Sequence, residues 1–223
     1  MPKKTTDKAA PSVHLRRMYV DCRYGQLHLR SAFASNGGFG ELTTLVCLHP
    51  ATTSSRVFEG LLRLMGSDRS AYAPDTPGSG ASDPPPSPAG LADHAAAIGD
   101  AIDQLRLRQV DLLGYHAGAG IAAELAIARP ELVRRLVMVG APALGEAGSD
   151  VPGLPPWPAR ERLPRVTQPV LVLRPKDDFR DVGPRAKEWL PEAKFVDLPE
   201  RGADLFDVAP EVVARHVRAF LDD

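Results

Sequence analysis

The segment Gly114-Tyr115-His116-Ala117-Gly118 constrains most strongly how this chain can fold. It follows an apolar run at 110–113 and precedes a segment, 121–128, with the composition of a buried helix. The pattern Gly-x-Ser-x-Gly between a strand and a helix is typical of a sharp turn that exposes a nucleophile at the edge of a sheet. Here a histidine, His116, stands in place of the serine. The sequence therefore predicts the turn and leaves open what an imidazole does there.

Strand and helix patterns alternate along the rest of the chain. Such alternation is typical of parallel βαβ units. We therefore predict an α/β protein, a three-layer α/β/α sandwich whose sheet is mostly parallel and mainly eight-stranded. The expected strands are 17–20 and 26–30, which form a hairpin, then 42–48, 71–73, 110–113, 136–139, 170–173 and 195–198. The expected helices are 57–65, 91–107, 121–128, 185–190 and 211–221.

The chain is long enough for one domain with a large core. We expect residues 1–15 to be a disordered N-terminal tail and residues 16–223 to be a single domain. Residues 141–168 are rich in proline and predict a long loop with at most one short helix near 159–162. Loops of this length inside a compact domain are usually functional.

Composition argues against several classes of partner. The chain has 27 basic and 28 acidic residues and a formal net charge of -1, so its charge favours neither nucleic acid nor a membrane surface. Two cysteines do not make a disulfide framework, and neither a signal peptide nor a membrane-spanning run is visible. We therefore expect a cytoplasmic protein.

Five motifs, in order, resemble those of the α/β-hydrolase fold superfamily. They are Leu48-His49-Pro50 at a strand end, Pro74-Asp75-Thr76-Pro77-Gly78-Ser79-Gly80-Ala81-Ser82, the turn at His116, the strand 169–173 followed by Asp177-Asp178, and Pro210-Glu211. The resemblance runs from about Tyr19 to the C-terminus. It implies an atypical member with a minimal cap, because only the proline-rich segment stands where a helical cap is usually inserted. The missing cap implies an open site or one covered by a neighbouring subunit, which allows a homo-oligomer.

The resemblance also implies a triad that is broken twice. His116 holds the nucleophile position, and Asp178 holds the acid position, with Asp177 as the near alternative. Ala203 falls where the catalytic histidine is expected, and the loop around it contains no histidine. The chain therefore lacks both the serine and the base that activates it.

Four interpretations of His116 remain open from the sequence. It can pair with Asp178 as a general base, with backbone N–H groups of Ala117 and of Ala51 or Thr52 holding an oxyanion. It can act as a covalent nucleophile, although no second base is evident. It can bind a metal with His49, Asp75 and Asp178, although their spacing is no recognised ligand motif and we predict no metal site. Finally, the protein can be an inactive pseudo-hydrolase that serves binding or assembly.

Further residues are candidates for the surroundings of His116. We expect a pocket with contributions from His49, Asp75, Tyr115 and Asp204. The resemblance implies a small-molecule substrate or ligand and no cofactor. Which substrate it is, and its size and charge, do not follow from the sequence.

Overall fold

The structure is a computed structural model that describes residues 12–34, 42–140, 157–176 and 183–223. Within these residues, one eight-stranded sheet has the order β1-β2-β4-β3-β5-β6-β7-β8. β1 pairs antiparallel with β2, β2 pairs antiparallel with β4, and the remaining neighbours are parallel. The strands are β1 (Val13–Cys22), β2 (Gly25–Ala34), β3 (Thr44–Leu48), β4 (Ala71–Pro74), β5 (Val110–Tyr115), β6 (Val133–Val139), β7 (Val170–Arg174) and β8 (Lys194–Asp197).

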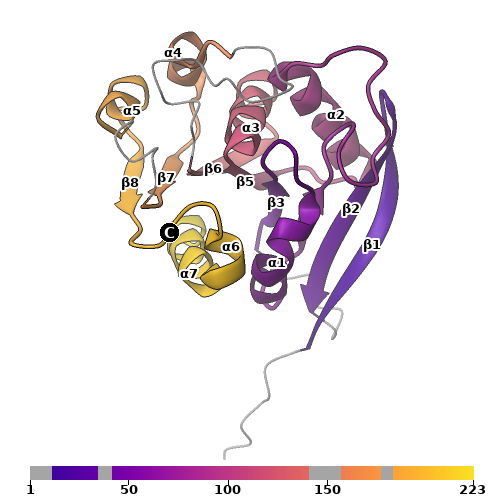
Figure 1. The fold of residues 1–223 in the computed structure, drawn as a ribbon, viewed down its shortest axis with the longest axis horizontal. Coiled ribbons are helices and arrows are strands. Elements are labelled where there is room, and N and C mark those ends of the chain that lie inside the picture. Colours follow the sequence, from indigo (N-terminus) through magenta and orange to yellow (C-terminus); the bar gives the residue numbers. More distant parts are fainter. Residues whose placement is uncertain (1–11, 35–41, 141–156, 177–182) are drawn as a thin grey trace, which may run out of the picture.

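Helices cover both faces of the sheet (Figure 1). One layer holds α2 (Leu91–Gln104), α3 (Ala117–Ala128), α4 (Ala159–Arg162) and α5 (Gly183–Trp189). The other holds α1 (Glu59–Met65), α6 (Leu205–Val208) and α7 (Pro210–Leu221). The predicted fold class, a three-layer sandwich around a mostly parallel sheet, is confirmed.

Alternation along the central strands divides the core into two clusters. In β5, Leu112 packs in the cluster that includes α2 and α3, whereas Leu113 and Tyr115 pack in the cluster that includes α1 and α7. In β6, Met138 belongs to the first cluster and Val139 to the second. Successive side chains of a strand point to opposite faces. A strand buried on both faces is therefore mostly apolar, as β5 and β6 are apart from Asp111, Arg134 and Arg135 near their starts.

The hairpin is longer than the sequence predicted. β1 and β2 pair over ten consecutive positions, from Val13↔Ala34 to Cys22↔Gly25, and β1 begins inside the segment expected to be a disordered tail. The charged pair Arg16-Arg17 hides the alternating pattern of β1. Both arginines are exposed, and they divide the partly buried positions of the strand into two sets.

Two helices also differ from the prediction. α3 begins at Ala117 rather than at residue 121, because two glycines near its start lower its intrinsic helix propensity and only its packing against the sheet selects the helix. α6 is a single turn that the sequence did not predict. The short helix expected near 159–162 is present as α4.

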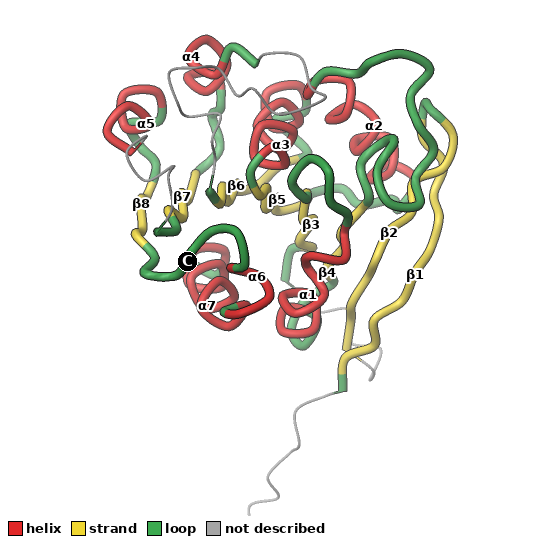
Figure 2. The backbone as a smooth tube through the Cα atoms, viewed as in Figure 1, coloured by secondary structure: helices red, strands yellow, loops and turns green. Residues whose placement is uncertain are grey.

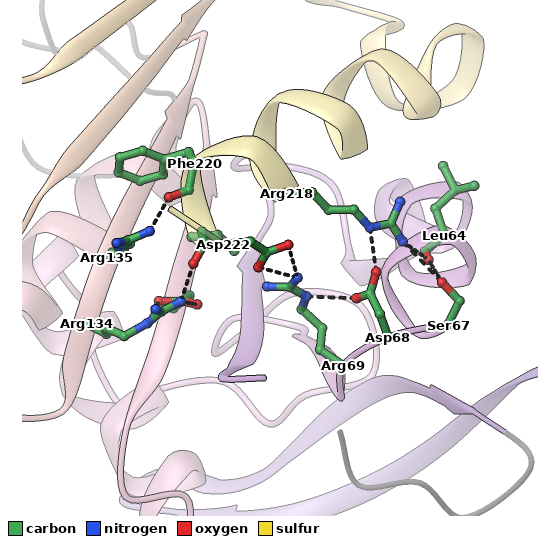
Figure 3. A network of polar contacts seen from close by, with 11 residues as sticks. Leu64, Ser67, Asp68, Arg69, Arg134, Arg135, Arg218, Phe220 and Asp222 are labelled. Atoms are coloured by element: carbon green, nitrogen blue, oxygen red, sulfur yellow. Dashed lines mark hydrogen bonds and ion pairs between the residues drawn. The ribbon is translucent and has the colours of Figure 1, made fainter. Parts of the chain in front are cut away.

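An ionic network joins the end of α7 to the end of the sheet at which the parallel strand β5 begins (Figure 3). The fully buried side chain of Arg69 donates to Asp222 at 2.7 Å and to Asp68 at 2.9 Å. Arg134 donates to both carboxylate oxygens of Asp111, at 2.9 and 2.6 Å, and to the carbonyl of Leu221 at 2.9 Å. The network lies at the start of β5, opposite the turn at its end, so it supports the fold rather than the candidate site.

We expect Arg134→Met to lower the free energy of unfolding by about 3 kcal/mol at pH 7, because it leaves the fully buried carboxylate of Asp111 without its cation. Burial raises the pKa of Asp111 and Arg134 opposes this rise. Without Arg134, the pKa of Asp111 in the folded state rises further above its value in the unfolded state. The loss in free energy of unfolding therefore grows as the pH rises through this folded-state pKa, and it shrinks at acidic pH. Urea denaturation between about pH 4.5 and about pH 8, a range above the usual carboxyl pKa, measures both effects.

The double variant Asp111→Asn/Arg134→Met is the matched control. It removes the buried charge together with its partner, and we expect it to recover most of the lost stability. An equal loss in the single and double variants would assign the effect to packing of the arginine side chain instead.

Candidate active site

His116 is the only residue between the end of β5 and the start of α3. Its backbone has φ 50° and ψ −117°, a conformation that non-glycine residues seldom adopt. The N–H of His116 donates to the carbonyl of Val139 at 3.0 Å, and its own carbonyl accepts from Ala119 at 2.9 Å. The chain therefore makes a sharp, strained turn here, held by hydrogen bonds from both sides. Strain of this kind persists only where the surrounding structure imposes it, and it clusters at functional sites.

Two glycines allow the helix to approach the sheet at this turn. A Cβ at Gly118 would lie 2.0 Å from the carbonyl oxygen of Leu48, at the end of β3. A Cβ at Gly114 would lie 2.3 Å from the carbonyl oxygen of Gly118. Any side chain at either position would separate α3 from the strand ends. The glycines of the sequence motif are thus required by close backbone contact.

The half-buried imidazole of His116 lies toward β6. A Cβ at Gly140, directly after β6, would lie 3.4 Å from the Nε2 atom of His116. The ring of Tyr115 lies beside the imidazole, with the two ring centroids 4.4 Å apart, and its Cε2 atom would lie 3.6 Å from the same Cβ at Gly140. In the sheet β6 separates β5 from β7, so the imidazole extends in the direction of β7. Asp177 and Asp178 follow β7 and lie outside the described residues.

The predicted oxyanion groups come from two neighbouring segments. Ala117 is the first residue of α3, and the first amides of a helix have no intrahelical acceptor. Ala51 and Thr52 lie in the loop after β3, where Thr52 has a positive φ of 64°. The contact of Gly118 with the end of β3 places the start of α3 beside this loop. The structure therefore brings these two segments together.

His49 is used within the protein. Its buried ring has Nδ1 2.7 Å from the carbonyl oxygen of Pro50, and its Nε2 accepts the backbone N–H of Thr76 at 2.9 Å. Because an amide N–H can only donate, Nε2 is the acceptor and Nδ1 carries the proton donated to Pro50. Burial lowers the pKa of His49. The residue thus joins the loops after β3 and β4 as a neutral imidazole.

Asp75 is also used internally, as a buried acceptor. Its carboxylate accepts the backbone N–H of Ser55 at 2.6 Å and of Ala81 at 3.0 Å, and it lies 2.9 Å from the Nδ1 atom of His28. Burial by itself raises the pKa of Asp75, but these hydrogen bonds outweigh it and hold that pKa below its usual value. Asp75 therefore fastens β2, the 3₁₀ turn Ser55–Phe58 and the loop after β4 to one another.

The loop after β8 is fastened to the turn at His116. The buried side chain of Tyr115 donates its hydroxyl hydrogen to the carbonyl of Gly202. Ala203 and Asp204, the next two residues, are exposed. The position at which the resemblance expects a histidine therefore directly follows a residue bonded to Tyr115. The sequence indicated Tyr115 as a candidate without indicating this link.

Sequence reasoning missed an anchor on α3. The buried carboxylate of Glu124 accepts Trp157 Nε1 and Arg162 Nε, each at 2.6 Å, and also accepts Arg162 Nη2. Trp157 is buried, with 5% of its surface exposed. These bonds fix the last part of the proline-rich segment, around α4, to α3. The signal that could have indicated the anchor was an acidic residue within an otherwise apolar helix.

Metal binding finds no support in the part of the chain that the structure describes. There, no three His, Cys, Asp or Glu side chains are placed to hold an ion. His49 and Asp75, two of the ligands considered from the sequence, use their polar atoms in the hydrogen bonds described above. Among the same residues, no helix combines the length and apolar character needed to cross a membrane.

A mostly parallel sheet between two helical layers, with a strained turn after a central strand, defines the α/β-hydrolase class of fold. The sequence matches the family described as alpha/beta hydrolase fold over residues 43–171, more than half of the chain. The chain therefore belongs to the alpha/beta hydrolase fold family.

Curated relatives match only in part. An uncharacterized protein of Mycobacterium tuberculosis is 28% identical over 102 residues, which are 46% of this chain and 30% of that protein. The 2-hydroxymuconate semialdehyde hydrolase of Pseudomonas sp. (strain CF600) is 50% identical over 48 residues, 22% of this chain and 16% of that protein. The matches span less than a third of the length of either relative.

Solved structures match over nearly the whole chain. The enol-lactonase from Burkholderia xenovorans LB400 has a TM-score of 0.79 at 14% identity, covering 92% of this chain and 100% of that one. E-2-(Acetamidomethylene)succinate hydrolase has a TM-score of 0.78 at 21% identity, covering 94% and 100%. At these identities the likeness establishes the fold alone.

We expect Asp75→Asn to destabilise the fold by about 2 kcal/mol at pH 7, because an amide cannot replace a carboxylate that accepts from three segments. The pKa of Asp75 is lower in the folded state than in the unfolded state. The ionised carboxylate therefore stabilises the fold at pH values above its unfolded-state pKa, and this stabilisation is lost as the pH falls through the folded-state pKa. The gap between wild type and variant should thus close below about pH 4. Urea denaturation across pH measures this difference, with Asp207→Asn, an exposed change on α6, as the control.

A second prediction concerns the backbone at His116. Glycine adopts positive φ without a steric penalty, whereas alanine keeps the strain of the turn. We therefore expect His116→Gly to be more stable than His116→Ala by about 1 kcal/mol. Thermal denaturation of the two variants measures this difference. Equal stability, or a more stable alanine variant, would contradict the strained conformation.

Proposed function

We propose that this protein is a small-molecule hydrolase or lyase-like enzyme in which a His116–Asp178 pair replaces the Ser-His-Asp triad. The observation that carries the proposal is the strained backbone of His116 at the turn after β5. The fold imposes this conformation at a cost of about 1–3 kcal/mol. A strained, half-exposed imidazole at the carboxyl edge of the sheet is a reasonable general base.

The direction of the ring supports the choice of acid. The imidazole extends over Gly140 toward β7, and the sequence places Asp178 shortly after that strand. The N–H of Lys176, just before this segment, donates to the carbonyl of Glu200 at 2.7 Å. The chain leaving β7 is thereby held beside the loop after β8. In the proposed pair, Asp178 orients the ring and stabilises the imidazolium form.

For hydrolysis, these roles define the steps. His116 takes a proton from water as the water oxygen attacks the substrate carbonyl carbon. The resulting oxyanion accepts hydrogen bonds from the N–H of Ala117 and from the N–H of Ala51 or Thr52. The tetrahedral intermediate then collapses, the bond to the leaving group breaks, and the imidazolium returns the proton to that group. For a lyase-like reaction, His116 would take the proton from a substrate C–H bond instead. The electron pair of that bond would form a double bond as a leaving group departs from the neighbouring carbon, and the imidazolium would return the proton to that group.

The alternative is an inactive pseudo-hydrolase that serves binding or assembly. Ala203 favours it, because an exposed methyl group occupies the position of the usual base. Under this alternative the fold and the turn remain, and the chemistry has been lost. An experiment that separates the two must report on the scaffold as well as on activity.

We expect His116→Ala and Asp178→Asn each to lower kcat/KM by about 100-fold or more. The assay uses a panel of activated esters, thioesters, enol lactones and 2-hydroxymuconate semialdehyde, the last two because of the similar proteins named above. His216→Ala, on α7, is the control and should keep full activity. Unchanged activity in both site variants would remove these residues from the mechanism.

A reconstructed triad distinguishes an altered mechanism from a dead site. His116→Ser/Ala203→His should react with a fluorophosphonate probe, because it returns the serine and its base to the expected positions. Wild type and His116→Ser alone should not react. If the reconstructed variant reacts while wild type is inert toward every substrate tested, the inactive alternative is correct.

A further inference from the structure

β1 forms one outer edge of the sheet. Within the described residues it pairs with β2 alone, over ten consecutive positions without a bulge (Figure 2). The backbone groups on its outer side are therefore not used by the sheet. A strand edge of this length is a template for pairing with another chain.

The usual devices that block such an edge are missing from β1. The strand Val13–Cys22 contains neither proline nor lysine, and its ladder is regular. Its charges are Arg16 and Arg17 near the centre and Asp21 near the end. Arg17 forms no ion pair with the described residues, and Tyr19 is 53% exposed. The charges of β1 therefore leave pairing with another strand possible, but they disfavour any register that places like charges opposite each other.

The end of the hairpin is held rigidly against the body of the protein. Arg23, in the turn, donates to both carboxylate oxygens of Asp100 on α2, at 2.8 and 3.0 Å. The N–H of Gln26 donates to Asp83 at 2.8 Å. The outer edge is therefore already ordered, and a partner strand would not have to order it.

We propose that β1 pairs antiparallel with β1 of a second copy of this chain, about a two-fold axis that passes through Tyr19. Along a strand, every second residue directs its backbone N–H and C=O groups to the outer side. In an antiparallel pair, two opposed residues either both direct these groups at each other or both direct them away. Opposed positions of a strand that pairs with itself must then differ by an even number. The axis consequently passes through a residue and not between two residues.

Charge selects among the registers that remain. If the two-fold axis passes through Arg16, Arg17 or Asp21, that residue lies opposite the same residue of the second copy, and two like charges face each other. Axes at Met18, Val20 and Cys22 oppose no two opposite charges within the strand. With the axis at Cys22, Asp21 would face only Arg23, which lies in the turn and is already bonded to Asp100.

An axis at Tyr19 opposes Arg17 to Asp21 of the second copy, and the symmetry makes this pair twice. Opposite charges directly across a sheet stabilise it and like charges destabilise it. The same register opposes Met18 to Val20 of the second copy. Both side chains are partly buried against the core cluster beside α2. The two sheets would then continue into one another.

Charge reversal tests the register. Sedimentation equilibrium should find a wild-type dimer, and Arg17→Asp or Asp21→Arg should each raise its dissociation constant by at least about tenfold. The double variant Arg17→Asp/Asp21→Arg restores both pairs and should return the dissociation constant to near the wild-type value. Arg63→Asp, an exposed change on α1, is the matched control and should have no effect.

Cross-linking tests the axis itself. Opposed Cα atoms in an antiparallel pair lie about 4.5–5.5 Å apart, within disulfide range. Tyr19→Cys should therefore form an intermolecular disulfide under mild oxidation. Asp21→Cys should not, since its own copy would lie about four residues further along the ladder.

Any of five outcomes would overturn the proposal. The first three concern self-association. These are a wild-type chain that is monomeric at all concentrations, single charge variants that dimerise like wild type, and a double variant that stays dissociated. A dimer that forms Asp21→Cys cross-links rather than Tyr19→Cys cross-links would refute the register. Capture of a strand from a different protein, with no self-association, would assign the edge to another partner. None of these results depends on the proposed activity, because β1 lies at the edge of the sheet, away from β5.

Discussion

The contact between the first turn of α3 and the ends of β3 and β5 determines the rest of the site. Gly118 leaves no room for a Cβ against Leu48, and Gly114 leaves none against Gly118 itself. With the helix held this close, one residue must make the whole reversal from strand to helix. That residue is His116, and its backbone conformation is a consequence of the packing. The position of the imidazole is thus set by these two contacts and by the hydrogen bond from the N–H of His116 to the carbonyl of Val139.

A second set of interactions holds the loops around this turn. Asp75 and His49 join the loops after β3 and β4, and Tyr115 joins β5 to the loop after β8. Glu124, on α3, holds the segment around α4 against that helix. Each is a buried polar group whose partners come from distant parts of the chain, and such groups are costly to leave unpaired. The rigidity of the site depends on these bonds.

Local sequence patterns predicted the fold class and the turn, whereas features that depend on distant partners were missed. The alternation of apolar strands and helices indicated the layers, and two glycines indicated the turn. The charged strand β1 was underestimated because its partner, β2, supplies the ladder that its own pattern does not reveal. His49 and Asp75 were grouped with His116 because they follow neighbouring strands. Only the hydrogen bonds across loops show that they stabilise the loops. The pairing of His116 with Asp178 stays a prediction.

The proposed oxyanion groups bear on whether a broken triad still allows catalysis. They belong to the backbone of Ala117 and of Ala51 or Thr52, and substitution at His116 or Ala203 does not remove a backbone N–H. In serine proteases that lack triad residues, an oxyanion hole and substrate binding alone retain about 10³–10⁴-fold catalysis over water. If these backbone groups hold an oxyanion as proposed, a general base at His116 would add to their effect. Under the proposed function, attack by water at this turn would therefore need neither a serine nor the histidine that usually activates it.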